Sequence, residues 1–508
     1  MDDNDNTPPV RDDRAREPAF AATGIAGLDD VLGGGFARGR TFLVEGNPGT
    51  GKTTLSLQFL MTGAVAGEPG IYVTLAETEE ELRSTARSHG WTLPPGVTVC
   101  ELVPADSLLD EGSQQSLLYS SDLELGEATR AIFAAVERLK PKRVVLDSLS
   151  EIRLLAQSSL RYRRQVLAMK HFFARHGTTV LLLDDLTADT ADRSTHSIAH
   201  GVVRFDELAP SYGAERRRLR VTKYRGQSFR GGYHDFVIVP GGVKVFPRLV
   251  ASEHHRPFVR EKVSSGLPGF DLVLGGGLDR GASVLCIGPA GTGKSLLGLQ
   301  IAAAAVARGE RAAVFCFDEE VGLLLDRAKA MGLDLAAMRD DGSLTLEQVD
   351  AAELSPGEFT QRVRARAAVA GASTVVIDSL NGYQNAMPAE RDLLLHMHEL
   401  RQYLNRQGVV AVMAVAQHGL VGDRKAPVDV TYLADTVVLL RYFEAFGRVR
   451  RAISVLKKRA GPHEDTIREF RITESGFEVG EPLASFQGVL RGIPSFAGVQ
   501  ATLMSGGT

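Results

Sequence analysis

The chain has 508 residues, of which 44% are hydrophobic and 24% are charged, with a formal net charge of −4. This length exceeds what one hydrophobic core usually supports, and the composition is that of a globular protein. The acidic balance argues against a protein that coats nucleic acid, and no apolar run reaches the length of a membrane span.

The first 18 residues are polar and acidic and lack the apolar run of a signal peptide. We expect residues 1–18 to form a disordered arm. Cys100, Cys286 and Cys316 form no CxxC or CxxH pair, which is typical of buried thiols in a reducing compartment. These features predict a cytoplasmic protein.

The first half of the chain alternates between strand-like and helix-like segments. Apolar runs at 41–45, 71–75, 143–147 and 180–184 predict buried strands, and residues 79–89 predict a helix. Continuous apolar strands alternating with helices are typical of an α/β fold with a parallel sheet covered on both faces. Ligands bind such sheets at the carboxyl ends of the strands.

A glycine-rich loop follows the strand at 41–45. Residues 46–53 read Gly-Asn-Pro-Gly-Thr-Gly-Lys-Thr and fit the P-loop pattern G-x-x-x-x-G-K-[ST]. In such loops backbone N–H groups surround the phosphates, the lysine reaches the β and γ oxygens, and the hydroxyl binds Mg²⁺. The pattern predicts binding of ATP and Mg²⁺, against the alternative of a coincidental glycine-rich turn.

The second half repeats the first. Residues 288–295 read Gly-Pro-Ala-Gly-Thr-Gly-Lys-Ser, and the glycine-rich leader at 24–35 recurs at the same offset at 266–277. Strand-like runs follow at 283–287, 313–317, 374–378 and 409–413. This repetition predicts a duplicated domain and makes two chance turns a poor alternative. The predicted nucleotide-binding residues are Gly46, Asn47, Pro48, Gly49, Thr50, Gly51, Lys52, Thr53 and Thr54, and Gly288, Pro289, Ala290, Gly291, Thr292, Gly293, Lys294, Ser295 and Leu296.

The repeat also sets the expected domain boundaries. We expect an N-terminal domain at 19–248, a C-terminal domain at 249–482 and a tail at 483–508. The polar segment from Pro247 to about Arg260 is the expected interdomain linker.

Asp147 and Asp378 each end an apolar strand and precede a serine. This is the Walker B arrangement, in which the carboxylate holds Mg²⁺, usually through water. Together with Thr53 and Ser295, these residues are the predicted metal ligands. The alternative is a strand-end aspartate that caps a turn.

Hydrolysis of ATP needs a group that orients or deprotonates water. Glu77 follows the second strand of the first half, and Asp318 with Glu319 follows the matching strand of the second. These three are the predicted catalytic acids. The alternative for Glu77 is an acidic helix N-terminus, since carboxylates favour that end.

Each half ends in a basic strand with the pattern Lys-x-Arg. Lys223 with Arg225, and Lys457 with Arg459, are predicted to stabilise charge on the γ-phosphate from across a subunit boundary. The alternative is a solvated strand face. The arginine-rich run at 216–220 lacks interleaved aromatic residues, so we interpret it as a hairpin surface.

These motifs, in this order over residues 20–490, resemble the KaiC family, the RecA-like ATPases and autokinases of the bacterial circadian clock. The resemblance implies two tandem RecA-like P-loop domains. It also implies a homo-hexamer of two stacked rings with ATP at the subunit interfaces. The N-terminal ring of such proteins hydrolyses ATP slowly, and the C-terminal ring phosphorylates itself on adjacent serine and threonine residues.

The sequence departs from the family pattern at three places. The first acidic pair reads Ala76-Glu77, so one carboxylate is missing, and in the second pair an aspartate, Asp318, replaces the first glutamate. The adjacent phosphoacceptors correspond to Thr431 and Tyr432. Thr431 is therefore the phosphoacceptor candidate, and the resemblance leaves autokinase activity open.

Three functions remain open at this point. The first is a KaiC-like ATPase, with possible Ser/Thr kinase activity, that signals through its nucleotide or phosphorylation state. The second is a DNA-dependent RecA-type recombinase or helicase, which the acidic charge and the lack of a long basic loop disfavour. The third is a nucleotide-gated scaffold with little turnover. The signalling partners are unknown, and we expect neither nucleic acid nor a membrane as a partner.

Overall fold

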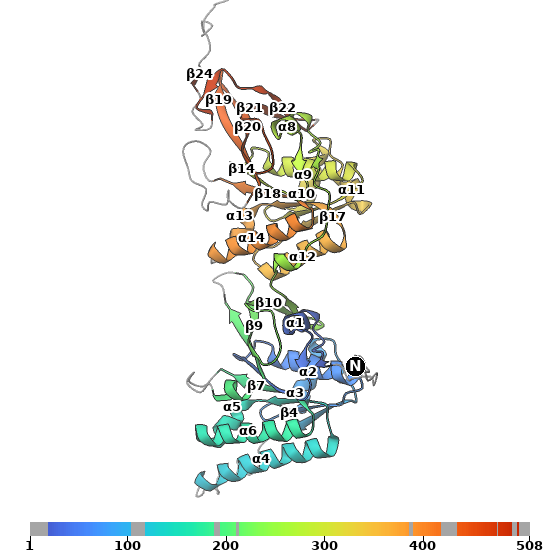
Figure 1. The fold of residues 1–508 in the computed structure, drawn as a ribbon, viewed down its shortest axis with the longest axis vertical. Helices are drawn as coiled ribbons and strands as arrows, with labels where there is room; N and C mark the ends of the chain where they lie inside the picture. The colour runs from blue at the N-terminus through green and yellow to red at the C-terminus, as the bar shows by residue number, and fades with distance from the viewer. Residues whose placement is uncertain are drawn as a thin grey trace, which may run out of the picture. The chain divides into compact units, whose positions relative to one another are not determined.

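The computed structural model describes residues 19–102, 117–186, 194–209, 213–385, 390–417, 434–474, 476–489 and 495–496. The chain forms two compact units that meet in the sequence at Arg248 and Leu249. Figure 1 colours the first unit from blue to green and the second from green to red. The predicted arm at 1–18 and the phosphoacceptor candidate Thr431 lie outside the described residues.

The first unit is built on one nine-stranded sheet. In spatial order its strands are β11 (Gly242–Phe246), β10 (His234–Val239), β9 (Arg216–Tyr224), β8 (Gly201–Leu208), β3 (Thr41–Gly46), β7 (Thr179–Asp185), β6 (Arg143–Asp147), β4 (Gly70–Thr74) and β5 (Val97–Glu101). The strands from β8 to β5 run parallel, whereas β8 to β11 pair in antiparallel fashion. A short pair, β1 (Phe20–Ala21) and β2 (Phe36–Ala37), lies outside this sheet.

Helices cover both faces of this sheet (Figure 1). Phe42 and Val44 of β3 belong to one hydrophobic core and Leu43 to another, so the alternating side chains of a single strand are buried on both sides. The first core includes residues of α1 (Ala26–Leu32), α2 (Lys52–Val65) and α3 (Glu79–Ser88). The second includes residues of α4 (Leu117–Leu139), α5 (Leu149–Ala156), α6 (Ser159–Arg175) and α7 (Ser194–Ile198).

The second unit has the same topology. Its sheet runs in the order β16 (Leu344–Gln348), β15 (Arg311–Cys316), β17 (Ala372–Asp378), β18 (Val410–Ala416), β14 (Ser283–Gly288), β19 (Thr436–Ala445), β20 (Arg448–Lys458), β21 (Arg468–Thr473) and β22 (Gly476–Pro482). Each strand has a counterpart at the same place in the first sheet. The predicted fold, two mainly parallel sheets in tandem, is thereby confirmed.

The second sheet is also covered on both faces. One core includes residues of α8 (Pro268–Val273), α9 (Lys294–Ala307), α10 (Val321–Lys329) and α11 (Leu335–Asp340). The other includes residues of α12 (Pro356–Arg364), η3 (Ala365–Val369), α13 (Leu380–Asn385), α14 (Glu390–Arg406) and the short η2 (Ala251–Glu253). The short pairs β12 (Lys262–Val263) with β13 (Leu278–Asp279), and β23 (Phe486–Gln487) with β24 (Ser495–Phe496), complete the described elements.

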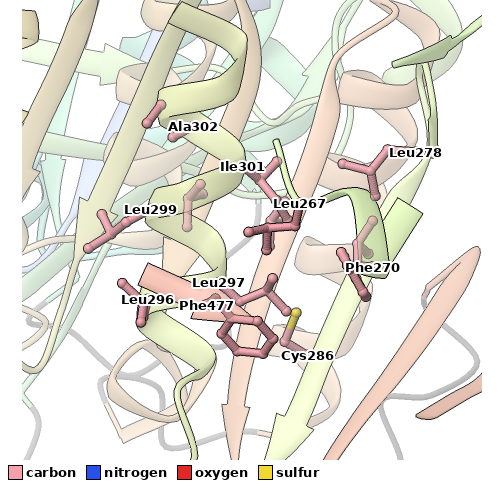
Figure 2. Packing of buried hydrophobic residues seen from close by; sticks show 14 of the residues in the cluster. Leu267, Phe270, Leu278, Cys286, Leu296, Leu297, Leu299, Ile301, Ala302 and Phe477 are labelled. Carbon is pink, nitrogen blue, oxygen red and sulfur yellow. The ribbon is translucent and has the colours of Figure 1, made fainter. Parts of the chain in front are cut away.

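The helix that follows the second P-loop is fixed by its apolar face. Figure 2 shows Leu296 and Leu297 of α9 beside Phe477 of β22 and Cys286 of β14, all of them buried. These residues are at most 3% exposed. Because α9 begins at Lys294, this packing also fixes the lysine relative to the sheet.

The leader motif before each P-loop has a packing role. A Cβ added to Gly27 would lie 2.0 Å from the carbonyl oxygen of Val245 in β11. A Cβ added to Gly269 would lie 3.0 Å from the Val479 side chain in β22. Each glycine therefore lets its leader helix approach the last strand of its sheet.

Parts of the expected linker and of the expected tail are packed against the second unit. Leu249 and Ala251, within the predicted linker, are buried in a core of the second unit, and the Ala251 N–H donates to a Glu399 carboxylate oxygen at 3.0 Å. Val489, within the predicted tail, is 1% exposed and packs with Phe443 and other residues of the β19–β20 hairpin. Charged and polar residues separate the apolar residues of the linker, and the tail interleaves apolar residues with glycine and polar residues, so neither shows the regular pattern of a buried element.

Candidate nucleotide-binding sites

The backbone of both glycine-rich loops has the shape that a P-loop requires. Gly49 and Gly51, between β3 and α2, have φ angles of 83° and 96°, left-handed values that favour glycine. A Cβ on Gly51 would also lie 2.6 Å from the Ile238 side chain. In the loop between β14 and α9, Gly291 and Gly293 have φ angles of 76° and 105°. Both loops thus have the left-handed glycines of a backbone turn that can surround an anion.

The P-loop lysine of the first unit is buried and has three partners. Lys52 is the first residue of α2, and its side chain is 6% exposed. Its ammonium donates to the carbonyl oxygens of Gly46 at 2.7 Å and Asn47 at 2.9 Å. It also lies 2.7 Å from Oδ1 of Asp185, the last residue of β7. These contacts hold the ammonium group of Lys52 beside the first residues of its own loop.

The lysine of the second unit has a different set of neighbours. Lys294 Nζ donates to the carbonyl oxygen of Pro289 at 2.8 Å. Burial lowers the pKa of Lys294, and the nearby carboxylate of Asp378 opposes that shift. By strand register, the residue that corresponds to Asp185 is Ala416, because Gly46 pairs with Asp185 and Gly288 with Ala416.

The predicted metal ligands come together in both units. The Tyr72 hydroxyl donates to Asp147 Oδ2 at 2.5 Å and is also hydrogen-bonded to the Thr53 side chain. In the second unit the Ser295 side chain is hydrogen-bonded directly to Asp378. Burial raises the pKa of both aspartates, and these hydrogen bonds oppose the rise. A hydroxyl beside a buried carboxylate at the end of a P-loop is the ligand set that Mg²⁺ uses with nucleotides.

The described residues contain no group of three or more His, Cys, Asp or Glu side chains placed to hold a metal ion alone. The hydroxyl and carboxylate of each P-loop site therefore fit a divalent cation only together with other ligands. Nucleotide phosphates and water are the usual ones, since Mg²⁺ keeps several waters and binds few carboxylates.

Glu77 lies between β4 and α3, where a tight turn fixes its backbone. The Thr74 hydroxyl accepts a hydrogen bond from the Glu77 N–H at 2.9 Å and donates to its carbonyl oxygen at 2.7 Å. Glu77 Oε2 is buried and has no hydrogen-bond partner. Burial raises the pKa of this carboxyl group, and the charges of Asp147, Glu81 and Asp185 raise it further. Glu77 thus has the features of a carboxylate that can act as a general base rather than of a surface charge in an ion pair.

The two acids of the second unit are already engaged. Cys316 pairs with Asp378 as Thr74 pairs with Asp147, so Glu319 occupies the place of Glu77 and Asp318 that of Ala76. The Ser379 hydroxyl donates to Asp318, and Glu319 forms an ion pair with Arg327 at 2.8 Å.

Lys223 does not lie next to its own P-loop. It pairs with Val202 of β8, which pairs with Leu43 of β3. Gly46 begins the loop three residues further along β3. At about 3.3 Å per residue and about 4.8 Å per strand, Lys223 and the loop are roughly 10 Å apart in each direction. Arg225 follows at the far end of the same strand and is exposed.

The basic residues of the second unit are placed in the same way. Lys457 pairs with Val437 of β19 and donates to the carbonyl oxygen of Ala434 at 2.9 Å. Arg459 lies 3.3 Å from a carboxylate oxygen of Asp435. None of the four predicted basic residues is brought to the P-loop of its own unit.

Two residues of the first site were missed by the sequence analysis, Tyr72 and Asp185. Each carried a signal. Tyr72 is an aromatic hydroxyl in an otherwise aliphatic strand, and Asp185 is the second acid of a doublet that ends β7. Elsewhere, no helix in the described parts of the chain is long and apolar enough to cross a membrane.

Comparison with known proteins agrees with the duplicated architecture. A family model described as "ATPase: KaiC" matches residues 21–250 and 263–484. The chain is 27% identical over 488 residues to the circadian clock protein KaiC3 of Synechocystis sp., covering 93% of this chain and 94% of the relative. It is 28% identical over 500 residues to the circadian clock oscillator protein KaiC of Synechococcus elongatus, covering 96% of this chain and 94% of the relative.

Proposed function

Because the chain belongs to the KaiC family of ATPases, we propose that it binds ATP with Mg²⁺ at both P-loops and hydrolyses ATP in its first domain. The observation that carries this proposal is the position and burial of the Glu77 carboxylate. Its buried, unpartnered carboxylate oxygen belongs to the turn after β4, the strand next to β6 and Asp147, and hydrolysis requires a group there that orients water. The raised pKa brings this carboxylate closer to the value of an effective base at neutral pH.

The neighbouring residues have complementary roles in this proposal. Lys52 and the loop amides bind the phosphates, Thr53 and Asp147 hold the cation, and Tyr72 orients Asp147. When bound, Mg²⁺ neutralises negative charge on the phosphate oxygens. Glu77 then takes a proton from the water that attacks the γ-phosphate.

We propose that the sites are completed by a second copy of the chain in a homo-hexameric double ring. Support comes from Lys223 and Arg225, which lie too far from their own P-loop to reach its phosphates. A guanidinium supplied by a neighbouring subunit is a known way to stabilise the transferring phosphoryl group. The relatives are named as circadian clock proteins, which favours a signalling role over a motor on nucleic acid. We propose that this role is cytoplasmic and is read out through the nucleotide or phosphorylation state.

The test is the substitution Glu77→Gln in a Lys294→Ala background, so that only the first site turns over. We expect phosphate release to fall by about 10²-fold or more, with nucleotide binding retained. Glu79→Gln is the matched control, since Glu79 is two residues away and is paired with Arg83. Unchanged turnover in Glu77→Gln would make Glu77 only a helix-end charge. DNA-stimulated hydrolysis would favour the recombinase or helicase, and nucleotide-dependent assembly without turnover would favour the scaffold.

Autophosphorylation by the second domain is a further candidate function. It is favoured by the second site's retention of two acids, Asp318 and Glu319, beside the Walker B strand. A kinase needs such an acid to accept the proton of the attacking hydroxyl. The shorter Asp318 and its hydrogen bond from Ser379 predict slow transfer.

Thr431 is the proposed acceptor. Incubation with ATP and Mg²⁺, followed by mass spectrometry, should show one phosphate at Thr431 that is lost in Thr431→Ala and in Lys294→Ala. Tyr432→Phe is the control, because its phenol would place the oxygen several ångströms away. A phosphate elsewhere, or none after prolonged incubation, would leave the chain an ATPase without kinase activity.

A further inference from the structure

The ammonium group of Lys52, in the first P-loop, contacts a carboxylate of its own domain. Asp185 Oδ1 lies 2.7 Å from Lys52 Nζ, and the Asp185 side chain is 28% exposed. The carboxylate is therefore partly open to solvent while it contacts the ammonium group that would bind a phosphate. Its charge also acts on Asp147 and Glu77, since it contributes to the raised pKa of both.

The second domain has the same backbone at this place but a different side chain. The Ser150 hydroxyl accepts from the Asp185 N–H at 3.2 Å and donates to its carbonyl oxygen at 3.3 Å. Asn381 does the same for Ala416, at 2.6 Å and 3.1 Å. A side chain thus bonds the backbone N–H and carbonyl of both strand ends, and the first carries a carboxylate where the second carries a methyl group.

A carboxylate at this place affects di- and triphosphates differently. A P-loop lysine reaches the β and γ oxygens of a nucleotide. A diphosphate lets Lys52 bind the β-phosphate while it stays paired with Asp185. A triphosphate brings its γ-phosphate up to the same ammonium and therefore up to the Asp185 carboxylate. Like charges a few ångströms apart repel strongly when partly shielded from water.

We propose that Asp185 is a specificity-determining residue that makes the first site favour nucleoside diphosphates over triphosphates, whereas the second site has no such bias. The inference rests on the proposed nucleotide binding at the first P-loop. A structural ion pair alone would change the stability of the nucleotide-free domain but would not alter the ratio of the two affinities.

The experiment measures binding of ADP and of β,γ-imido-ATP, each with Mg²⁺, to the full chain by competition with a fluorescent ADP. A Lys294→Ala background confines binding to the first site. Asp185→Asn keeps the shape of the side chain and removes its charge. We expect the affinity for imido-ATP to rise about tenfold and that for ADP by less than about threefold.

The reciprocal variant is Ala416→Asp in a Lys52→Ala background, which confines binding to the second site. It should weaken imido-ATP about tenfold while ADP changes little. Equal shifts for both nucleotides, or no shift in Asp185→Asn, would overturn the inference while nucleotide binding stood. Absence of Lys52-dependent binding in every variant would overturn the proposed function and the inference with it.

Discussion

The first and second nucleotide sites are built on equivalent strands. The side chains that contact the P-loop lysine and the Walker B carboxylate nevertheless differ between them. In the first, the phenol of Tyr72 contacts the Walker B carboxylate and Asp185 contacts the lysine. In the second, these places belong to Val314 and Ala416. The two domains therefore share the backbone of the P-loop, whereas residues on the neighbouring strand β7 and on β4, beside the Walker B strand, differ from their counterparts in the second domain.

The same contrast extends to the acids. Glu77 has an unpartnered buried oxygen, whereas its counterpart Glu319 is paired with Arg327. The first site has lost one acid at Ala76 and keeps a free one, and the second keeps two that are both engaged. A site specialised for hydrolysis and a site with slower chemistry are the simplest reading of this difference.

The largest expected effect tests whether the first site is shared between subunits. Lys52→Ala and Arg225→Ala should each reduce first-site turnover, by about 10³-fold for the arginine. When the two variants are mixed and allowed to exchange subunits, about a quarter of the interfaces regain both groups. Phosphate release should then recover in proportion, with Lys294→Ala present throughout.

Arg130→Ala is the control for that experiment, because Arg130 is exposed and donates to a backbone carbonyl of its own helix. No recovery on mixing would mean that Arg225 acts on the site of its own subunit, or that it takes no part in hydrolysis. A mixture that recovers fully, rather than in part, would also contradict a single shared site.

A smaller effect concerns the metal affinity of the first site, where the Tyr72 hydroxyl has no counterpart in the second. Tyr72→Phe removes one hydroxyl that orients Asp147, and loss of such a contact typically weakens metal binding about tenfold or more. We expect about a tenfold loss in Mn²⁺ affinity at the ADP-loaded first site, measured by electron paramagnetic resonance in a Lys294→Ala background.

Tyr162→Phe is the matched control, since Tyr162 is also buried but its hydroxyl contacts Thr195, away from the metal ligands. Tighter Mn²⁺ binding in Tyr72→Phe would show that the hydroxyl competes with the cation instead of orienting its ligand.

The smallest effect concerns stability without nucleotide. Burial raises the pKa of Asp147 and Asp378 in the folded chain. A carboxyl group whose pKa is raised by folding favours the folded state below its unfolded pKa, and this contribution is lost as pH rises through the folded pKa. Asp147→Asn and Asp378→Asn should therefore each stabilise the nucleotide-free protein at pH 7, by roughly 1 kcal/mol.

The gain should shrink as the pH is lowered toward 4, because the wild-type carboxyls become protonated and resemble the amide. Urea unfolding at several pH values measures it. A constant difference across that range would mean that the aspartates are stabilised by contacts other than their protonation state.

The sequence was sufficient for the fold because the decisive signals were local. The P-loop at 46–53 and its repeat at 288–295 located the strand-to-helix junctions, and uninterrupted apolar runs located the central strands. Asp185 could not be assigned in the same way. Its importance depends on the parallel pairing of β3 with β7, which brings together residues far apart in the chain. The engagement of Asp318 by Ser379 is likewise a tertiary contact that no local pattern reports.

The segment that joins the domains in sequence has a practical consequence for separating them. The family model stops at residue 250 and resumes at 263, which invites a cut near 260. Leu249 and Ala251, however, fill the core beneath α14. A C-terminal fragment starting after them would lose buried side chains of a kind that cost about 2–5 kcal/mol when a leucine is truncated. An isolated second domain should begin at Leu249, and one begun later would expose an apolar hollow and aggregate.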